Sequence, residues 1–212
     1  KMARVIDHVL TLLPFEPPYM EAAGMPADFV GHPVAAAPVV RPSAAEAFRA
    51  KLGLGTAAPL LCVLPGSRGG EIARLAPVFR GVIAELRTKM PDLAVVVPAA
   101  HPIADQVLDR FQDMATVLDP RGLSVADAEA EKRAAFAAST TALAASGTVS
   151  LELAATGTPH VVAYTASALT GFMVKRMALI DTANLVNITT DTRVVPEFLL
   201  ERCTAELIAP AV

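Results

Sequence analysis

The sequence has 212 residues, 53% of them hydrophobic and 18% charged, and a formal net charge of −3 at pH 7. This size and apolar content suit one domain, or one and a half, with a sizeable core. The weakly acidic balance argues against a nucleic-acid partner, which normally requires a basic face. Cys62 and Cys203 are too few and too far apart for a zinc site or a disulfide framework.

The N-terminal stretch differs in organisation from the rest of the chain. Residues 7–34 predict a strand, a short helix and a second strand, and an Ala/Pro-rich linker, AAAPVVRPS, follows. We therefore expect residues 1–35 to be the end of a preceding domain that is truncated here. The first residues lack the apolar segment of a signal peptide, and no apolar run reaches the ~18–20 residues of a spanning helix. These features predict a cytoplasmic protein.

Residues 36–212 alternate between strand and helix patterns. A capping-box pattern, Ser43-Ala44-Ala45-Glu46, predicts the start of a helix that ends at Gly53. The expected strands are 59–64, 92–97, 115–118, 141–145 and 159–164, and the expected helices are 71–89, 102–113, 124–138 and 148–156. This alternation predicts an α/β fold, a Rossmann-like doubly wound parallel sheet. A last helical pattern begins near Thr204 and is expected to be cut short.

The loop PGSRGG joins the first expected strand of this domain to a long helix. In such sheets ligands bind beyond the carboxyl ends of the strands, where helix N-termini attract phosphates. Glycines permit close backbone approach, and Ser67 and Arg68 add a hydroxyl and a permanent cation. An ordinary turn with a surface arginine explains the same residues, and Glu71 is also explained by the helix dipole.

A second loop of the same kind, Ser146-Gly147-Thr148, follows the strand at 141–145. Glu152 lies four residues after Thr148, so both face the same side of the helix. A carboxylate there can accept hydrogen bonds from sugar hydroxyls while the loop holds phosphates; a solvated first-turn acid is the alternative. Two such loops favour a nucleotide diphosphate. The P-loop pattern GxxxxGK[ST] and the dinucleotide pattern GxGxxG are both missing.

Four stretches together closely resemble the lipid-A-disaccharide synthase family: DHVLTLLPFEPPYMEAAGMPADFVGHPV, LPGSRGGEI, ALAASGTVSLELAATGTPHVVAY and LVNITTDTRVVPEFLLERCT. The resemblance covers nearly the whole chain in the family's order. It implies an inverting GT-B glycosyltransferase that transfers 2,3-diacylglucosamine from UDP-2,3-diacylglucosamine to 2,3-diacylglucosamine 1-phosphate, forming a β-1,6 disaccharide and UDP. Residues 1–35 would end the acceptor-side N-terminal domain and include the hinge. Residues 36–212 would form the C-terminal, UDP-sugar-binding domain.

The resemblance also implies roles for particular residues. The implied UDP- and phosphate-binding residues are Gly66, Ser67, Arg68, Ser146, Gly147 and Thr148. Glu152 would hold the ribose, and Asn187 and Glu197 would face the interdomain cleft. His32 matches the hinge, where we expect a structural role.

No complete active site is expected in the chain. The family's catalytic base is expected in the N-terminal domain, and no carboxylate cluster has the spacing of a metal site, so we expect no metal and no cofactor. Structural roles are expected for the four histidines, His8, His32, His101 and His160. The chain departs from the family pattern at Thr165, where many members have arginine, and at Thr192, where glycine is common.

The stretch SALTGFMVKRMALI, residues 167–180, has an amphipathic helical pattern. A helix packed on the sheet explains the pattern, and an interfacial helix that gives peripheral membrane contact is the alternative. We also expect a homodimer, because the strand VLTLL would leave an open edge and the family is expected to exchange C-terminal segments. Two other functions stay open: another GT-B UDP-sugar enzyme, and a non-catalytic nucleotide-binding or dimerisation fragment.

Overall fold

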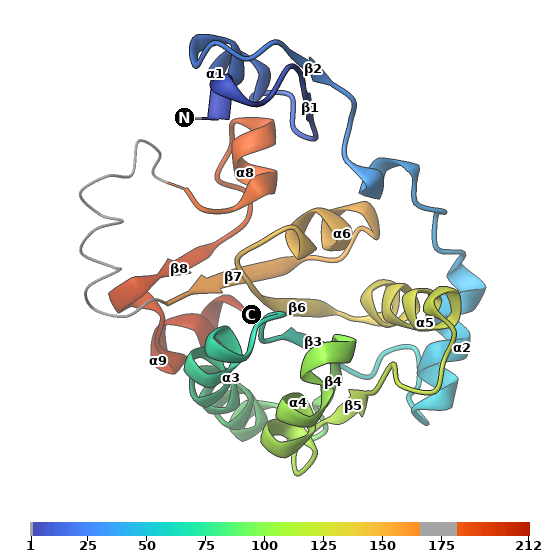
Figure 1. Cartoon of the computed structure of the whole chain (residues 1–212). Coiled ribbons are helices and arrows are strands. Elements are labelled where there is room, and N and C mark those ends of the chain that lie inside the picture. Colours follow the sequence, from blue (N-terminus) through green and yellow to red (C-terminus); the bar gives the residue numbers. More distant parts are fainter. Residues whose placement is uncertain (1, 166–181) are drawn as a thin grey trace.

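The computed structural model describes residues 2–165 and 182–212 (Figure 1). Its centre is a parallel sheet of six strands in the order β5-β4-β3-β6-β7-β8. The strands are β3 (Leu60–Leu64), β4 (Ala94–Pro98), β5 (Thr116–Leu118), β6 (Thr141–Ala145), β7 (His160–Tyr164) and β8 (Glu197–Leu199). All five pairings are parallel, which confirms the expected Rossmann-like doubly wound sheet.

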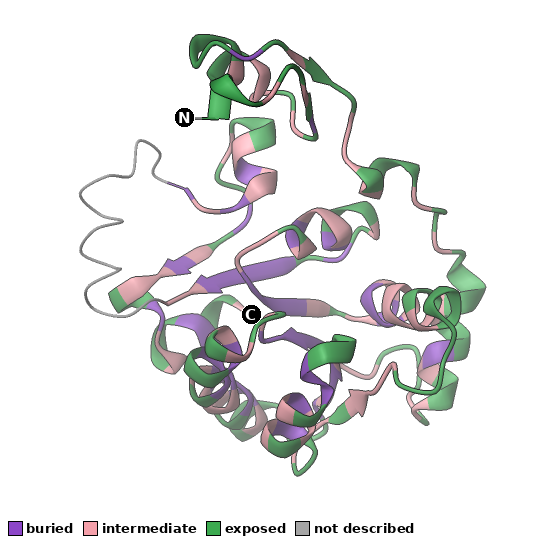
Figure 2. Ribbon diagram, viewed as in Figure 1, coloured by how far each residue is buried: buried purple, intermediate pink, exposed green. Residues whose placement is uncertain are grey.

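Helices cover both faces of this sheet. Successive side chains of a strand point to opposite faces, and in the buried strands both sets are apolar, so each face needs a helical layer. Leu61 and Val63 of β3 pack with α3 (Gly69–Lys89), α4 (Ala104–Phe111) and α9 (Ala205–Ile208). Leu60, Cys62 and Leu64 pack instead with α2 (Pro42–Lys51), α5 (Val125–Ala138) and α6 (Val149–Ala155). Figure 2 shows the result as buried strands between two partly exposed helical layers.

The N-terminal segment forms the predicted strand, helix and strand. These elements are β1 (Val9–Thr11), α1 (Pro17–Ala22) and β2 (Ala27–Phe29), and Figure 1 shows them apart from the six-stranded sheet. β1 pairs with β2 in parallel, so the strand that we expected to be open is paired on one side. The linker is anchored, since the Arg133 guanidinium of α5 donates a hydrogen bond to the Pro38 carbonyl oxygen.

Two local expectations were wrong or incomplete. The capping box at Ser43 does not form: α2 begins at Pro42, with Arg41 as N-cap and no side-chain cap, because proline has the φ angle of a first helical residue. Gly53 ends this helix with φ +68°, as expected. The sequence analysis also missed β8 and α8 (Leu185–Thr190).

Several short 3-10 helices complete the chain. They are η1 (Met2–Arg4), η2 (Pro33–Ala36), η3 (His101–Ile103), η4 (Leu200–Arg202) and η5 (Ala209–Ala211). The helical pattern expected from Thr204 is confirmed as α9 followed by η5. The amphipathic stretch 167–180 lies outside the described residues. Among the described helices, none has the length and apolar character needed to cross a membrane.

Candidate functional site

The two predicted loops follow β3 and β6, the adjacent strands at which the order of the sheet reverses. Strand β3 leads to β4 and β5 on one side, whereas β6 leads to β7 and β8 on the other. A crevice opens at such a point because the connections leave in opposite directions from the carboxyl ends of the strands. The topology therefore brings residues 65–68 and 146–148 together.

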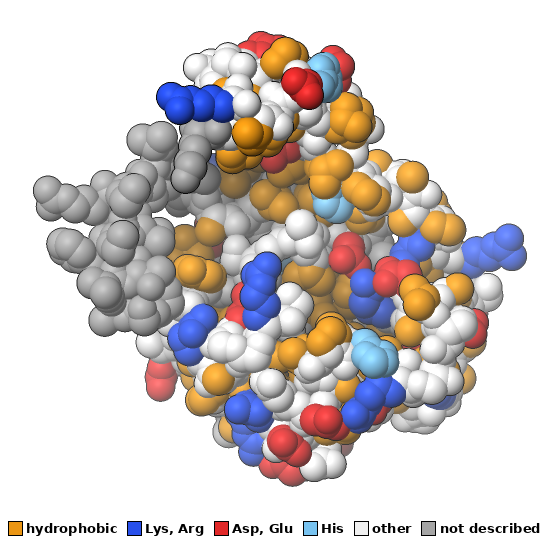
Figure 3. All heavy atoms as spheres, in the orientation of Figure 1, with side chains coloured by type: hydrophobic (Ala, Val, Ile, Leu, Met, Phe, Trp, Pro, Cys, Tyr) orange, Lys and Arg blue, Asp and Glu red, His pale blue; other side chains and the backbone are white. Residues whose placement is uncertain are grey.

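A cavity of about 620 Å³ lies between these loops, which is a size typical of small-ligand sites. All six residues expected to bind UDP phosphates line it, and so does Glu152. The remaining wall comes from the start of η3, the loop after β5 and helix α5. Figure 3 shows acidic and basic side chains close together on this face, over α5 and α6.

The loop after β3 has a backbone conformation that requires glycine. Gly66 has φ +118°, and a Cβ atom built on it would lie 2.1 Å from Oε2 of Glu71. The same oxygen accepts a hydrogen bond from the Ser67 N–H at 3.0 Å. From the sequence, the dipole of the helix was sufficient to explain an acidic residue at position 71. In the structure the Glu71 side chain also shapes this loop.

Arg68 is the N-cap of the 21-residue helix α3, so the first N–H groups of that helix lie beside it. Its side chain is exposed and forms no hydrogen bond or ion pair with the described residues. A permanent cation and a helix N-terminus thus face one cavity, an arrangement that favours an anionic ligand.

The loop after β6 is partly held by internal hydrogen bonds. The Ser146 hydroxyl lines the cavity and donates to the Ala183 carbonyl oxygen at 2.8 Å, so toward a ligand it can act only as an acceptor. Thr148 is exposed at the start of α6, and its side chain makes no capping bond to that helix. The hydroxyl of Thr148 is therefore available to a ligand, whereas that of Ser146 also links the loop to the segment before α8.

Helix α5 contributes charged residues that sequence reasoning missed. Lys132 Nζ lies 2.7 Å from Oε2 of Glu152 and 2.9 Å from Oε2 of Glu129. Burial opposes the charge of Lys132, but hydrogen bonds to both carboxylates outweigh it and raise the pKa of the ammonium. The sequence showed only Glu129 and Lys132 three residues apart; it could not show that α5 packs beside α6.

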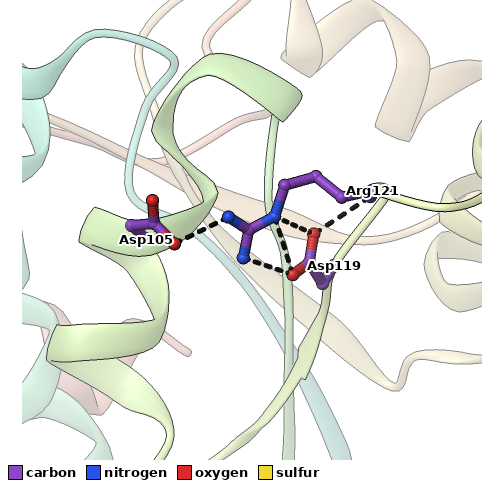
Figure 4. A network of polar contacts seen from close by, with 3 residues as sticks. All are labelled: Asp105, Asp119 and Arg121. Carbon is purple, nitrogen blue, oxygen red and sulfur yellow. Dashed lines mark hydrogen bonds and ion pairs between the residues drawn. The ribbon is translucent and has the colours of Figure 1, made fainter.

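The loop after β5 forms the rim of the cavity. Figure 4 shows the guanidinium of Arg121 between Asp119 of this loop and Asp105 of α4. Its Nη1 lies 2.7 Å from Asp105, and its Nη2 lies 2.6 Å from Asp119. The hydrogen bonds from Arg121 lower the pKa of Asp119 to about 2. These contacts hold the neighbouring Pro120 in the cavity wall.

Asn187 and Glu197, expected at the cleft, are not among the residues lining this cavity. Asn187 is fully buried and donates to the Val195 carbonyl oxygen at 2.9 Å. The Glu197 carboxylate accepts hydrogen bonds from Thr182, from the Ala183 and Asn184 N–H groups and from Asn187. These bonds hold the segment that leads into α8 against β8.

The histidines have varied surroundings. His8 bonds Asp28 at 2.9 Å, and His32 accepts from the Val34 N–H at the start of η2. His160 is buried beside the Thr158 carbonyl oxygen, and burial lowers its pKa. His101, expected to be structural, is exposed and lines the cavity. Within residues 2–165 and 182–212, no three His, Cys, Asp or Glu side chains gather as metal ligands.

One departure from the family pattern, Thr192, has a local structural correlate. Asp191 ends α8 in the left-handed region, with φ +50°, and the Thr192 N–H bonds the Asn187 carbonyl oxygen at 3.0 Å. Asp191 therefore takes the positive φ of the turn, so Thr192 needs no glycine at its own position.

Two solved glycosyltransferase structures resemble this chain in fold. An ADP-heptose lipopolysaccharide heptosyltransferase II from E. coli matches with a TM-score of 0.52 and 13% identity, over 81% of this chain and 50% of its own. A family 9 glycosyl transferase from Veillonella parvula matches with a TM-score of 0.52 and 14% identity, over 82% of this chain and 51% of its own. These likenesses confirm the fold, a Rossmann-like sheet of the GT-B type.

Relatives of known name are much closer in sequence. A lipid-A-disaccharide synthase from Ruegeria pomeroyi is 56% identical over 212 residues, which cover 99% of this chain and 53% of that protein. One from Rhodospirillum centenum is 43% identical over 100% of this chain and 51% of its own length. The chain thus spans about half the length of these relatives. A family model described as lipid-A-disaccharide synthetase matches residues 1–212, so the chain belongs to the lipid-A-disaccharide synthase family.

Proposed function

We propose that this chain is the UDP-binding half of a glycosyltransferase of lipid A biosynthesis. The whole enzyme would transfer 2,3-diacylglucosamine from UDP-2,3-diacylglucosamine to 2,3-diacylglucosamine 1-phosphate, forming the β-1,6 disaccharide and UDP. The observation that carries this proposal is that the two loops and Glu152 line one cavity at the reversal of the strand order. The family membership of the chain supports the reaction.

The cavity has the chemistry that a nucleotide diphosphate requires. Arg68 and the N-terminus of α3 provide positive charge for the phosphates, and this charge would also stabilise UDP as it leaves. Glu152 provides an acceptor for the ribose hydroxyls, and apolar residues of the far wall, Leu123 and Val125, provide a surface for the base. We assign residues 36–212 to this donor-binding domain and residues 1–35 to the end of the acceptor-side domain and the hinge.

The acceptor hydroxyl must also lose a proton during transfer. Because the chain spans about half of its relatives, we assign the proton acceptor and the acceptor site to the other half. We also propose that Asn187 and Glu197 act at the interdomain cleft as a scaffold. The hydrogen bond between their side chains connects α8 to β8, which is compatible with that role. On this assignment the chain alone makes no disaccharide.

Calorimetric titration of the chain with UDP, ADP and uridine tests the assignment. We expect UDP to bind and ADP to bind far more weakly, since the wall after β5 must discriminate the base. Uridine should also bind more weakly than UDP, because it lacks the diphosphate. No heat with millimolar UDP would refute the donor site, and equal binding of ADP would refute the base assignment.

We further propose that the chain forms a homodimer and works on the cytoplasmic face of a membrane. Exposed apolar residues at the N-terminal unit, Leu10, Phe29 and Val30, and the segment 196–212 are the proposed contacts with a second copy. Sedimentation at micromolar concentration should show twice the mass of 22.1 kDa, and a monomer would refute the dimer. Co-sedimentation with anionic vesicles tests the peripheral membrane contact, which a failure to pellet would refute.

A further inference from the structure

Lys132 occupies a position that the proposed function does not by itself assign. It lies on α5, reaches across to α6 and contacts the carboxylate expected to hold the ribose. We propose that Lys132 is a positioning residue, which fixes the Glu152 carboxylate for the ribose hydroxyls of a nucleotide. The proposal rests on the proposed function of this cavity and adds the group that orients its acceptor.

The Lys132 ammonium is already paired with protein carboxylates. Two carboxylates lie within 2.9 Å of Nζ, those of Glu129 and Glu152. The ammonium also stands 5.9 Å from the centre of the Phe136 ring, one helical turn along α5. An ammonium has three donors, so little capacity remains for a phosphate. Lys132 therefore acts on a ligand through Glu152 and not by direct contact.

The two oxygens of Glu152 are not equivalent in this arrangement. Oε2 faces Lys132, while Oε1 forms no hydrogen bond or ion pair with the described residues. Because the ion pair holds one oxygen, the carboxylate loses rotational freedom, and Oε1 of this cavity-lining residue is left for a ligand. The side chains of Lys132 and Glu152 are only 29% and 27% exposed, so this pair is screened less than a surface pair.

The charge of Lys132 also matters to a diphosphate. Four carboxylates line the cavity, those of Glu71, Glu129, Glu131 and Glu152, against the cations Arg68 and Lys132. An uncompensated carboxylate near the phosphates would repel them. By compensating the charge of Glu152, Lys132 allows this carboxylate to accept hydrogen bonds from the ribose without repelling the diphosphate of the same nucleotide.

The test compares UDP with 2′,3′-dideoxyuridine 5′-diphosphate, which keeps the base and both phosphates but lacks the hydroxyls. Calorimetry on wild type, Lys132→Met, Lys132→Arg, Glu152→Gln and the double variant Lys132→Met/Glu152→Gln gives Kd for both ligands. We expect Lys132→Met to weaken UDP about tenfold, as for a charged hydrogen bond, and the dideoxy ligand less than about twofold. Lys132→Arg should restore UDP binding, because the cation is kept.

The double variant separates an effect through Glu152 from a direct one. Once Glu152 is glutamine, Lys132→Met should change the Kd of UDP by less than about twofold, since the coupled partner is gone. Lys89→Met is the control, because Lys89 is exposed at the end of α3 and does not line the cavity. It should bind both ligands as wild type does, and thermal melting verifies that every variant folds.

Two results separate the two proposals. Equal losses of UDP and of the dideoxy ligand in Lys132→Met would show direct contact with the phosphates and would overturn the positioning role alone. A folded wild-type chain that binds neither ligand would overturn the donor site itself, and the positioning role with it.

Discussion

The residues to which family resemblance gives site roles, at the nucleotide and at the interdomain cleft, fall into two regions that differ in hydrogen bonding. Around the cavity, Arg68 and Thr148 are exposed and Oε1 of Glu152 is unused within the described part of the chain. Under α8, by contrast, Asn187 is buried and Glu197 accepts four hydrogen bonds from its neighbours. Both regions belong to recognisable motifs. Unused polar groups suit ligand binding, whereas satisfied ones suit a scaffold.

The largest effect should come from the scaffold region, as a loss of stability. Glu197→Ala leaves the Ala183 N–H without its acceptor. It also removes one of two acceptors from the Asn184 N–H and one from the Asn187 amide. We expect the free energy of unfolding to fall by about 2–4 kcal/mol, because several partly buried donors lose a charged partner together. Urea denaturation measures this loss, with exposed Glu46→Ala on α2 as the control. Unchanged stability would show that Glu197 is not a scaffold residue.

The next effect should come from the cavity, on binding and not on stability. Arg68→Ala removes a cation that forms no bond with the described residues, so the melting temperature should stay within about 1 °C of wild type. Its UDP affinity should fall by about 1.5–3 kcal/mol, as for a hydrogen bond to a charged group. Arg74→Ala, at an exposed position of α3 six residues further along, is the control. Calorimetry with uridine should show little loss; equal losses for UDP and uridine would mean that Arg68 only shapes the loop.

Gly66→Ala should affect both stability and UDP binding, because Gly66 belongs to the cavity loop and has a φ angle that only glycine adopts without strain. Alanine at φ +118° is unfavourable, and its Cβ would displace the Glu71 carboxylate that holds the Ser67 N–H. We expect a loss of about 1–2 kcal/mol in stability together with weaker UDP binding. Gly53→Ala is the control, since Gly53 has φ +68° with open space around it. If the two variants behaved alike in UDP titrations, the contact with Glu71 would be irrelevant to the site.

Local patterns were sufficient to predict most of the sheet and both cavity loops. Five of its six strands are strongly apolar runs, and the loops carry glycines directly after two of them. Strand β8 was missed because it has only three residues and combines a charged side chain, Glu197, with apolar ones. Its place at the sheet edge depends on pairing with β7, which the local sequence does not show. Lys132 was missed for a similar reason, since its partner Glu152 lies on another helix and only packing brings them together.

The smallest effect should come from Arg121, which lies on the cavity rim but has its donors used, as in the scaffold region. Arg121→Gln should raise the pKa of Asp119 from about 2 toward its ordinary value of ~3.9, because the hydrogen bonds that favour the carboxylate are lost. In wild type this interaction stabilises the fold above pH ~4, and the stabilisation disappears as the pH falls toward 2. Carbon-detected NMR of the carboxyl groups can follow Asp119, with Asp113 as the control, because Arg80 and not Arg121 lowers the pKa of Asp113. UDP binding at neutral pH should change little. A large loss of UDP affinity in Arg121→Gln would place its guanidinium among the ligand contacts and would break the distinction between used and unused polar groups.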